Sequence, residues 1–317
     1  MIATAVHGGD LLSSIGNTPL VELTRLSPRR GVRLFAKLES ANPTGSIKDR
    51  VAKAMIEAAE ASGELQPGRT ILEPSSGNTG ISLAMIGRLR GYPVRIVLPE
   101  SATPERVKLL TLYGAEIVFS PGELGSNGAV AMARELAAAD PSLFMPFQYA
   151  NPANPDVHYR TTAVEILADC PDVDVLVAGL GTGGTLMGCA RRLREANPDV
   201  QIVAAEPLAG DPVSGLRSLD EGYVPEVLDV RQLDRKLLVS NAEALAGLRA
   251  LAREEGIFAG VSSGGVVSVA RRVAAELEAP ANVVCVFADG GWKYLSAGLW
   301  DRDEAELIDE METRLWW

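Results

Sequence analysis

Apolar runs bounded by turn residues alternate with segments of helical periodicity along most of the chain. The apolar runs are typical of buried strands, and they predict strands at residues 33–38, 70–73, 94–99, 115–120, 143–149, 173–180, 201–206 and 283–289. Helical periodicity separates most of them, for example at residues 79–90, 129–139 and 242–255, and a further helix with proline in its first turn is expected after Thr103. This alternation predicts an α/β fold whose largely parallel sheets are covered by helices.

Two irregular segments interrupt the alternation. Residues 151–155 read Asn-Pro-Ala-Asn-Pro, the densest turn signal in the chain, and they predict a domain boundary. Residues 208–231 form the longest stretch without clear periodicity, and a loop of that length in a compact domain is usually a lid or a binding loop.

Lys48 occupies an unusual place in the pattern. Ser46 and Asp49 are spaced as in a capping box, which predicts the start of a helix. The apolar residues behind it recur at helical spacing and are expected to face the core: Val51, Ala54, Met55, Ala58 and Ala59. Lys48 projects from the same stripe, where burial and the positive end of the helix dipole both favour the neutral amine that a Schiff base requires. The alternative is a snorkelling lysine with its ammonium in water, and this stretch alone leaves both open.

Three loops rich in glycine and serine follow predicted strands and precede predicted helices. Residues 75–80 read Ser-Ser-Gly-Asn-Thr-Gly, and such small residues let a ligand approach the backbone and the free N–H groups of the helix. Residues 179–185 contain a GxGxxG pattern, which favours a phosphate cradle and supports a nicotinamide site only weakly. Residues 260–265 follow an apolar run, and their serines can equally be plain helix caps. Together with Lys48, the loops suit a phosphorylated carbonyl cofactor held by a lysine.

Composition excludes several other classes of protein. The net charge of −11 argues against a nucleic-acid-binding surface. The three cysteines, Cys170, Cys189 and Cys285, show no close pairing, which fits a reducing cytoplasm. With two histidines and no cysteine cluster, no metal site is expected. The first ten residues do not resemble a signal peptide, and no apolar run is long enough to span a membrane.

In their order and spacing, these motifs resemble the cysteine synthase family of pyridoxal-phosphate enzymes, which have the fold-type II or tryptophan-synthase-β-like fold. The matching segments run from Gly16-Asn17-Thr18-Pro19-Leu20 to Lys293-Tyr294-Leu295-Ser296. The resemblance implies a cytoplasmic homodimer with a smaller mobile substrate-binding lobe at residues 42–152. The larger cofactor-binding lobe would be formed by residues 1–41 and 153–317. The family implies these cofactor contacts: Lys48 in the Schiff base, Asn78 at the ring hydroxyl, Gly181, Thr182, Gly183, Gly184 and Thr185 at the phosphate, and Ser262 at the pyridine nitrogen. It places Ser75, Ser76, Asn78, Thr79 and Gln148 at the carboxylate of the amino-acid substrate.

The implied reaction is a β-replacement that forms L-cysteine. A serine beside the pyridine nitrogen leaves that nitrogen unprotonated, which limits the electron sink and favours β-elimination. The released Lys48 can then take the substrate α-proton, and an α-aminoacrylate remains for a sulfur nucleophile.

Two segments depart from family members that use O-acetylserine. Residues 211–225 lack the usual His-Lys-Ile-Gln-Gly stretch, and residues 288–294 read Ala-Asp-Gly-Gly-Trp-Lys-Tyr where Pro-Ser-Ser/Thr-Gly-Glu-Arg-Tyr is usual. Both resemble the actinobacterial CysM-type enzymes, which use O-phosphoserine and take sulfur from a thiocarboxylated carrier protein. Arg217 would then clamp the substrate phosphate, because a guanidinium binds phosphate oxygens bidentately. The alternative is a solvated loop arginine balanced by Asp220 and Glu221.

Other functions remain open at this level. Within the family, an O-acetylserine sulfhydrylase that uses sulfide is the second hypothesis, and a cystathionine β-synthase core is the third. A nicotinamide-dependent oxidoreductase or a non-catalytic small-molecule-binding protein would leave Lys48 unexplained. Residues 161–165, Thr-Thr-Ala-Val-Glu, replace the usual Thr-Gly-Pro-Glu and are interpreted as a local packing variation. Trp316 and Trp317 either cover apolar surface or reach the active-site mouth.

Overall fold

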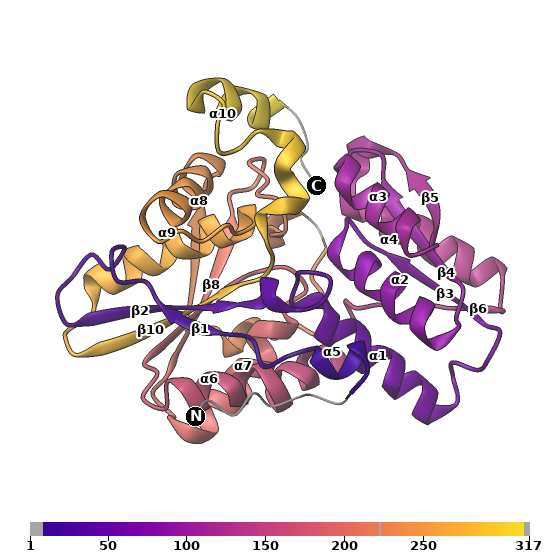
Figure 1. Cartoon of the computed structure of the whole chain (residues 1–317), viewed down its shortest axis with the longest axis horizontal. Helices are drawn as coiled ribbons and strands as arrows, with labels where there is room; N and C mark the ends of the chain where they lie inside the picture. Colours follow the sequence, from indigo (N-terminus) through magenta and orange to yellow (C-terminus); the bar gives the residue numbers. More distant parts are fainter. Residues whose placement is uncertain (1–8, 222, 314–317) are drawn as a thin grey trace.

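Two sheets of mainly parallel strands organise the chain (Figure 1). This computed structural model describes residues 9–221 and 223–313, so the expectations for Trp316 and Trp317 lie outside the described residues. The larger sheet has the order β1-β2-β10-β7-β8-β9, formed by Leu20–Glu22, Val32–Leu38, Ala281–Phe287, Val175–Gly179, Gln201–Pro207 and Arg235–Val239. The smaller has the order β5-β4-β3-β6, formed by Glu116–Ser120, Val94–Pro99, Thr70–Pro74 and Leu143–Phe144. Within the described ranges every named strand pair is parallel except β1 with β2, so the predicted fold class is confirmed.

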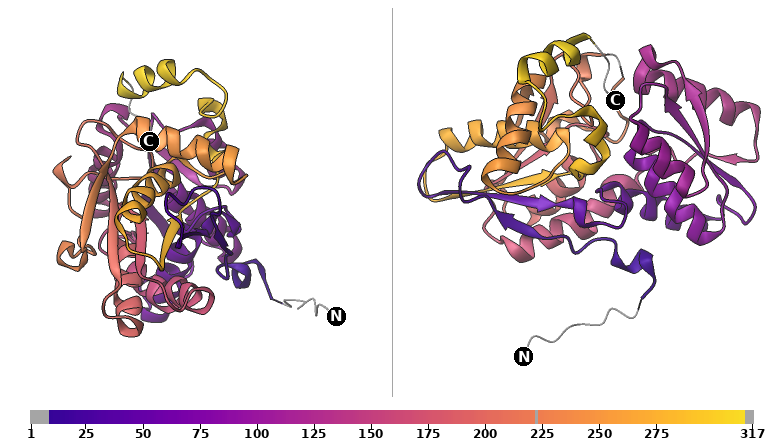
Figure 2. Two further views of the ribbon diagram at one scale, coloured as in Figure 1. Left: turned by 90° about the vertical axis from the view of Figure 1, so that its left-hand side faces the viewer. Right: turned by 45° about the horizontal axis from the view of Figure 1, so that its top comes forward.

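Helices cover both faces of each sheet, as parallel strands joined by crossovers require (Figures 1 and 2). Around the smaller sheet lie α1 (Lys48–Ser62), α2 (Asn78–Arg90), α3 (Pro104–Leu112) and α4 (Gly125–Ala139). Around the larger sheet, α6 (Ala163–Asp169) and α7 (Gly184–Ala196) lie on one side, and α8 (Asn241–Glu254) and α9 (Val261–Glu276) on the other. The short α5 (Ala153–Val157) and a π-helical turn at His158–Thr162 precede α6, and α10 (Glu304–Thr313) is the last described helix.

Alternate residues of the larger sheet belong to two different cores, one on each face. Val175 and Val177 of β7 pack with residues of α8 and α9. Leu176 and Ala178 of the same strand pack with residues of α6 and α7. Side chains of a strand alternate between faces with a period of two, so a sheet buried on both sides reads as a continuous apolar run. This is why the central strands were predictable from short apolar stretches.

The expected strand at residues 143–149 is wrong beyond its first two positions. Pro146 has no N–H to donate to a sheet ladder. Phe147 has a φ of +54°, outside the strand region. The backbone N–H groups of Phe147 and Gln148 donate to the carboxylate of Glu73, at 2.8 and 2.9 Å. These backbone hydrogen bonds therefore go to the buried Glu73 carboxylate and not to a neighbouring strand. The segment forms a loop, and this loop lines the cavity described below.

Two smaller expectations also need correction, and two strands were not expected. Ala58 is exposed, so the buried stripe of α1 contains Ala52 and Ile56 in addition to the other predicted residues. The apolar run before residue 260 is not a strand: Ala259 forms one isolated bridge with Gly290, and α9 begins directly afterwards. The edge strands β1 and β9 were not predicted, because they are short or only partly buried.

Candidate active site

One cavity of about 300 Å³ gathers segments that are far apart in the sequence. Among the predicted site residues, Lys48, Ser75, Ser76, Asn78, Thr79, Gln148, Gly181, Thr182, Arg217 and Ser262 line it. A smaller cavity of about 60 Å³ shares Lys48, Gly181, Thr182 and Ser262 with the first and adds Gly183 and Thr185. Gly184 lines neither cavity and is the first residue of α7. The structure thus brings all but one of the predicted positions to one connected site.

Lys48 is the first residue of α1 and lines both cavities. Burial lowers the pKa of its amine to about 8, although the nearby Glu73 carboxylate acts in the opposite direction. Burial in turn raises the pKa of Glu73 to about 7, against the two backbone N–H donors and Lys48. The amine is therefore easier to deprotonate than an ordinary lysine, as nucleophilic attack on a carbonyl requires.

The predicted capping box at the start of α1 is wrong. The N-cap position is Ile47, which has no side-chain cap. The carboxylate of Asp49 instead accepts hydrogen bonds from the backbone N–H of Thr44 (2.7 Å), from the Thr44 hydroxyl and from the Ser82 hydroxyl (2.6 Å). Because Ser82 belongs to α2, these bonds tie the turn before Lys48 to the neighbouring helix.

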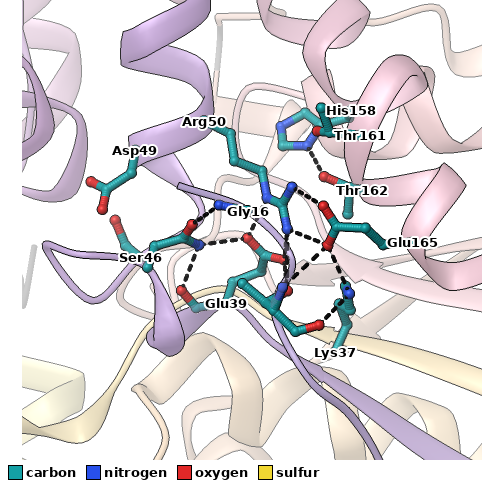
Figure 3. Close-up of polar contacts among 12 residues, drawn as sticks. Gly16, Lys37, Glu39, Ser46, Asp49, Arg50, His158, Thr161, Thr162 and Glu165 are labelled. Atoms are coloured by element: carbon teal, nitrogen blue, oxygen red, sulfur yellow. Dashed lines mark hydrogen bonds and ion pairs between the residues drawn. The ribbon is translucent and has the colours of Figure 1, made fainter. Parts of the chain in front are cut away.

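Arg50, two residues after Lys48, anchors the other side of α1 through a buried network of charges (Figure 3). Its guanidinium donates to Glu39 at 2.8 and 2.9 Å and to Glu165 at 2.6 and 2.7 Å. Lys37 forms an ion pair with the same Glu165 at 2.8 Å. These charges lower the pKa of Glu165 to about 2, although burial alone would raise it. Glu165, a residue that segment 161–165 shares with the usual Thr-Gly-Pro-Glu, therefore joins α6 to the helix that carries Lys48.

The loop before α7 forms a cradle that only small residues can build. Gly183 has a φ of +87°, which favours glycine. A Cβ on Gly184 would lie 1.9 Å from Oδ1 of Asn154, which is buried without a hydrogen-bond partner among the described residues. Asn154 also donates to the Thr182 hydroxyl at 3.0 Å. Backbone N–H groups at a helix start and two threonine hydroxyls are suitable donors for a phosphate, so these residues fit the phosphate of pyridoxal phosphate.

His158 supports this cradle and carried no recognised signal in the sequence. Its ring is fully buried, with Nδ1 2.9 Å from the Thr162 hydroxyl and Nε2 3.3 Å from the Thr185 hydroxyl. Burial, with the positive charges of Arg50 and Lys48, holds the pKa of His158 well below its ordinary value. The Thr185 hydroxyl of the cradle is therefore in contact with a neutral imidazole.

The loop between β3 and α2 is held by its own hydroxyls. Ser75 Oγ accepts hydrogen bonds from the backbone N–H groups of Gly77 (3.1 Å) and Gly80 (3.0 Å). The Thr79 hydroxyl donates to Oε1 of Gln148 at 2.7 Å, which joins this loop to the one after β6. The neutral donors expected for a carboxylate ligand therefore lie on two interlocked loops.

Arg217 enters the same cavity from the long loop after β8. Its Nη1 donates to Oδ1 of Asn127 at 2.8 Å, and its guanidinium lies 5.2 Å from the ring centre of Tyr149 and 5.5 Å from that of Tyr223. Contacts with two aromatic rings and an amide place this side chain in a defined position. The expectation of a binding loop at residues 208–231 agrees with this arrangement.

Arg106 also lines the cavity, and the sequence reasoning missed it. Its side chain is buried, donates to the Ser76 carbonyl at 3.1 Å and to Ser214 Oγ at 3.3 Å, and has an Nε without a partner among the described residues. The proline in the first turn of α3 located the helix, but nothing local distinguishes this arginine from a surface one. Only packing of α3 against the larger half of the molecule reveals it.

All three cysteines are buried and unpaired, away from the cavity linings. Burial raises the pKa of Cys170 to about 11, and those of Cys189 and Cys285 to about 12. Within residues 9–221 and 223–313, no cluster of ligating side chains suits a metal ion. No helix in that same part of the chain is long and apolar enough to cross a membrane.

Two helix-flanked parallel sheets share a cavity that is lined by a lysine and by a glycine-rich phosphate cradle, and this arrangement is that of a fold-type II pyridoxal-phosphate enzyme. The chain belongs to that family: residues 11–289 match the family described as "Pyridoxal-phosphate dependent enzyme". It is 44% identical to a probable cysteine synthase of Bacillus subtilis (strain 168), over 95% of this chain and 99% of the relative. It is 42% identical to cysteine synthase B of Pseudomonas aeruginosa, over 90% of this chain and 96% of that relative. The crystal structure of O-ureido-L-serine synthase is similar with a TM-score of 0.86 at 40% identity, over 94% of this chain and 98% of that one.

These relationships make the chain a pyridoxal-phosphate-dependent enzyme of the cysteine synthase type. They also explain the GxGxxG pattern at residues 179–184 without a nicotinamide cofactor.

Proposed function

We propose that the enzyme makes L-cysteine by β-replacement on O-phosphoserine, with sulfur supplied by a small thiocarboxylated carrier protein or by sulfide. The observation that carries the proposal is the position of Arg217, whose guanidinium lines the substrate cavity between an amide and two aromatic rings. A phosphate leaving group bears charge that a guanidinium can hold bidentately, whereas an acetyl ester bears none.

The charges that line the cavity support an anionic substrate. Besides Lys48, which is assigned to the cofactor, Arg106 and Arg217 are the basic residues of the lining, and Glu123 and Asp289 are the acidic ones. Arg217 and the buried Arg106 are therefore both available to offset a negative charge brought in by the substrate.

The other site residues receive the roles that their positions suit. Bound pyridoxal phosphate would supply the electron sink that labilises the leaving group on the substrate β-carbon. The cradle at residues 181–185 would hold its phosphate, Asn78 its ring oxygen and Ser262 its ring nitrogen. The interlocked loops of Ser75, Ser76, Thr79 and Gln148 would grip the substrate carboxylate, and Lys48 would accept the α-proton at Nζ.

Residues 42–152 are proposed to act as the smaller mobile lobe, and the enzyme as a cytoplasmic homodimer. Arg217 lies on the loop after β8, and its partner Asn127 lies on α4, which packs on the smaller sheet. Arg217 and Asn127 thus belong to different lobes. The binding of a phosphate beside Arg217 would therefore depend on how closely the two lobes approach each other.

The proposal is tested with Arg217→Ala and two leaving groups. Stopped-flow absorbance of the bound cofactor follows the first half-reaction with O-phosphoserine or O-acetylserine as the substrate. Loss of a charge-assisted contact of about 2–3 kcal/mol predicts a decrease of about 10²-fold in kcat/KM for O-phosphoserine, with a much smaller change for O-acetylserine. Equal losses for the two substrates would refute the phosphate clamp and favour an O-acetylserine sulfhydrylase.

Arg134→Ala is a matched control. Arg134 also lies over the Tyr223 ring, at 5.9 Å, but it does not line the cavity. It should leave the preference between the two substrates unchanged. Arg217→Lys keeps the charge without the planar fork and should give an intermediate preference.

A further inference from the structure

A buried lysine outside the predicted site contacts the residue that is proposed to bind the cofactor ring. Lys293 lies in the 3₁₀ segment Gly291–Ala297 and is fully buried. Its Nζ donates to Oδ1 of Asn78 at 2.6 Å. The Thr103 hydroxyl, just before α3, donates to the Lys293 carbonyl at 3.0 Å and holds this segment in place. Lys293 was part of the family resemblance, but neither the reaction nor the substrate preference gives it a role.

The surroundings of Asn78 allow only one orientation of its amide. A protonated lysine has donors and no acceptor, so the atom that faces Lys293 must be the oxygen. On the other side, Asn78 Nδ2 donates to the carboxyl oxygen Oδ2 of Asp289 at 2.8 Å. Tyr294 donates to the same Asp289 oxygen at 2.8 Å, which keeps that acceptor oriented.

One N–H of the amide remains after these contacts. The Nδ2 group has two hydrogens, and Asp289 takes one of them. Asn78 lines the main cavity together with Lys48 and Ser262, so the second hydrogen is available to a ligand there. A reversed amide would present its oxygen to the ligand instead, which would repel an electron-rich ring oxygen.

We propose that Lys293 is a positioning residue that locks the Asn78 amide with an N–H toward the ring oxygen of pyridoxal phosphate. The inference rests on the proposed contact between Asn78 and the cofactor, and it is independent of the leaving group of the substrate. Burial lowers the pKa of Lys293 to about 8, against the charges of Asp289 and Asp49. The lysine is therefore mainly an ammonium near neutral pH and remains donor-only there.

The test is a double-mutant cycle between positions 293 and 78, measured on the holoenzyme. Lys293→Met removes the donor at similar volume, and Asn78→Ala removes the amide. The readouts are the dissociation constant of pyridoxal phosphate and the absorption maximum of the bound cofactor. Each single variant should weaken cofactor binding by about tenfold, the value of one hydrogen bond, and shift the absorption band in the same direction. The double variant should be no weaker than the single variants, because Lys293 acts through Asn78.

Lys293→Arg is the conservative control, since a guanidinium is also donor-only. It should restore the wild-type band and most of the affinity. If Lys293→Met does not fold, Lys293→Gln completes the same cycle with a smaller loss, because a glutamine amide can present either atom.

Two results would overturn the inference. Additive losses in the double variant would mean that Lys293 acts on general stability and not through the amide. An unchanged band and affinity in Asn78→Ala would remove the contact between Asn78 and the cofactor. Neither result depends on the Arg217 experiment, so failure here is distinguishable from failure of the O-phosphoserine proposal.

Discussion

Glu165→Gln removes one negative charge from the buried network that anchors the helix of Lys48. The Glu165 carboxylate accepts two hydrogen bonds from Arg50 and forms an ion pair with the fully buried Lys37. It also accepts from the backbone N–H groups of Asn17 (3.0 Å) and Thr18 (3.3 Å). The neutral glutamine leaves Lys37 without a carboxylate partner among the described residues.

The pKa of Glu165 gives the size of the effect. It falls from the ordinary value of 4.5 to about 2 in the folded protein, a difference worth about 3 kcal/mol of stability. Because the pKa is lowered by folding, this stability is complete above the unfolded pKa and is lost as the pH falls through the folded pKa. We therefore expect Glu165→Gln to lower the free energy of unfolding by about 3 kcal/mol near pH 7, and by less as the pH falls from about 4.5 toward 2.

Urea unfolding followed by circular dichroism and by tryptophan fluorescence measures this difference at a series of pH values. Glu22→Gln is the matched control, since Glu22 also pairs with an arginine, Arg33, but on the surface at 2.6 Å. Such an exposed pair contributes at most about 1 kcal/mol. A destabilisation by Glu165→Gln no larger than that of Glu22→Gln, or one that is constant from about pH 7 to pH 3, would refute the argument.

Two further predictions concern the cofactor site. Gly184→Ala brings a methyl group against the Asn154 amide, so it should destabilise the fold by about 1–3 kcal/mol and weaken the binding of pyridoxal phosphate. Thermal unfolding with and without the cofactor will measure both effects. An unchanged midpoint in both states would contradict the tight packing of the cradle. Lys48→Ala should bind the cofactor without covalent attachment. Reduction with borohydride should then leave no cofactor bound covalently to the protein, and mass spectrometry should find no adduct. An adduct that persists would place the Schiff base on another lysine.

The strand-to-helix loops of the site are predictable because their signals are local. Residues 75–80 and 179–185 each place small and polar residues between an apolar run and a helical pattern. Parallel strands end at the same edge of their sheet, so each loop is expected at the carboxyl edge of its own sheet. That the two edges face one cavity follows from the packing of the two sheets, which the local pattern does not contain. The structure places one loop after β3 and the other after β7, and both line the main cavity.

The rest of the site depends on contacts between distant residues, which the local pattern does not contain. Lys293 meets Asn78 across 215 positions, and Arg50 meets Glu165 across 115. Arg106 is an ordinary helical arginine until α3 packs on the larger half. The short β6 has a similar cause, because the Glu73 carboxylate takes the backbone donors that a longer strand would have used.

The three buried cysteines provide a native reporter of local opening. Only an exposed thiolate reacts with a maleimide or an aromatic disulfide, and these thiols are both covered and protonated in the folded protein. All three belong to the cores of the larger sheet: Cys170 and Cys189 lie on one face and Cys285 on the other. The rate of thiol labelling under native conditions will therefore measure opening of the larger half alone. Comparison of that rate before and after addition of pyridoxal phosphate will show how much of the cofactor's binding free energy stabilises this half, without introducing a probe.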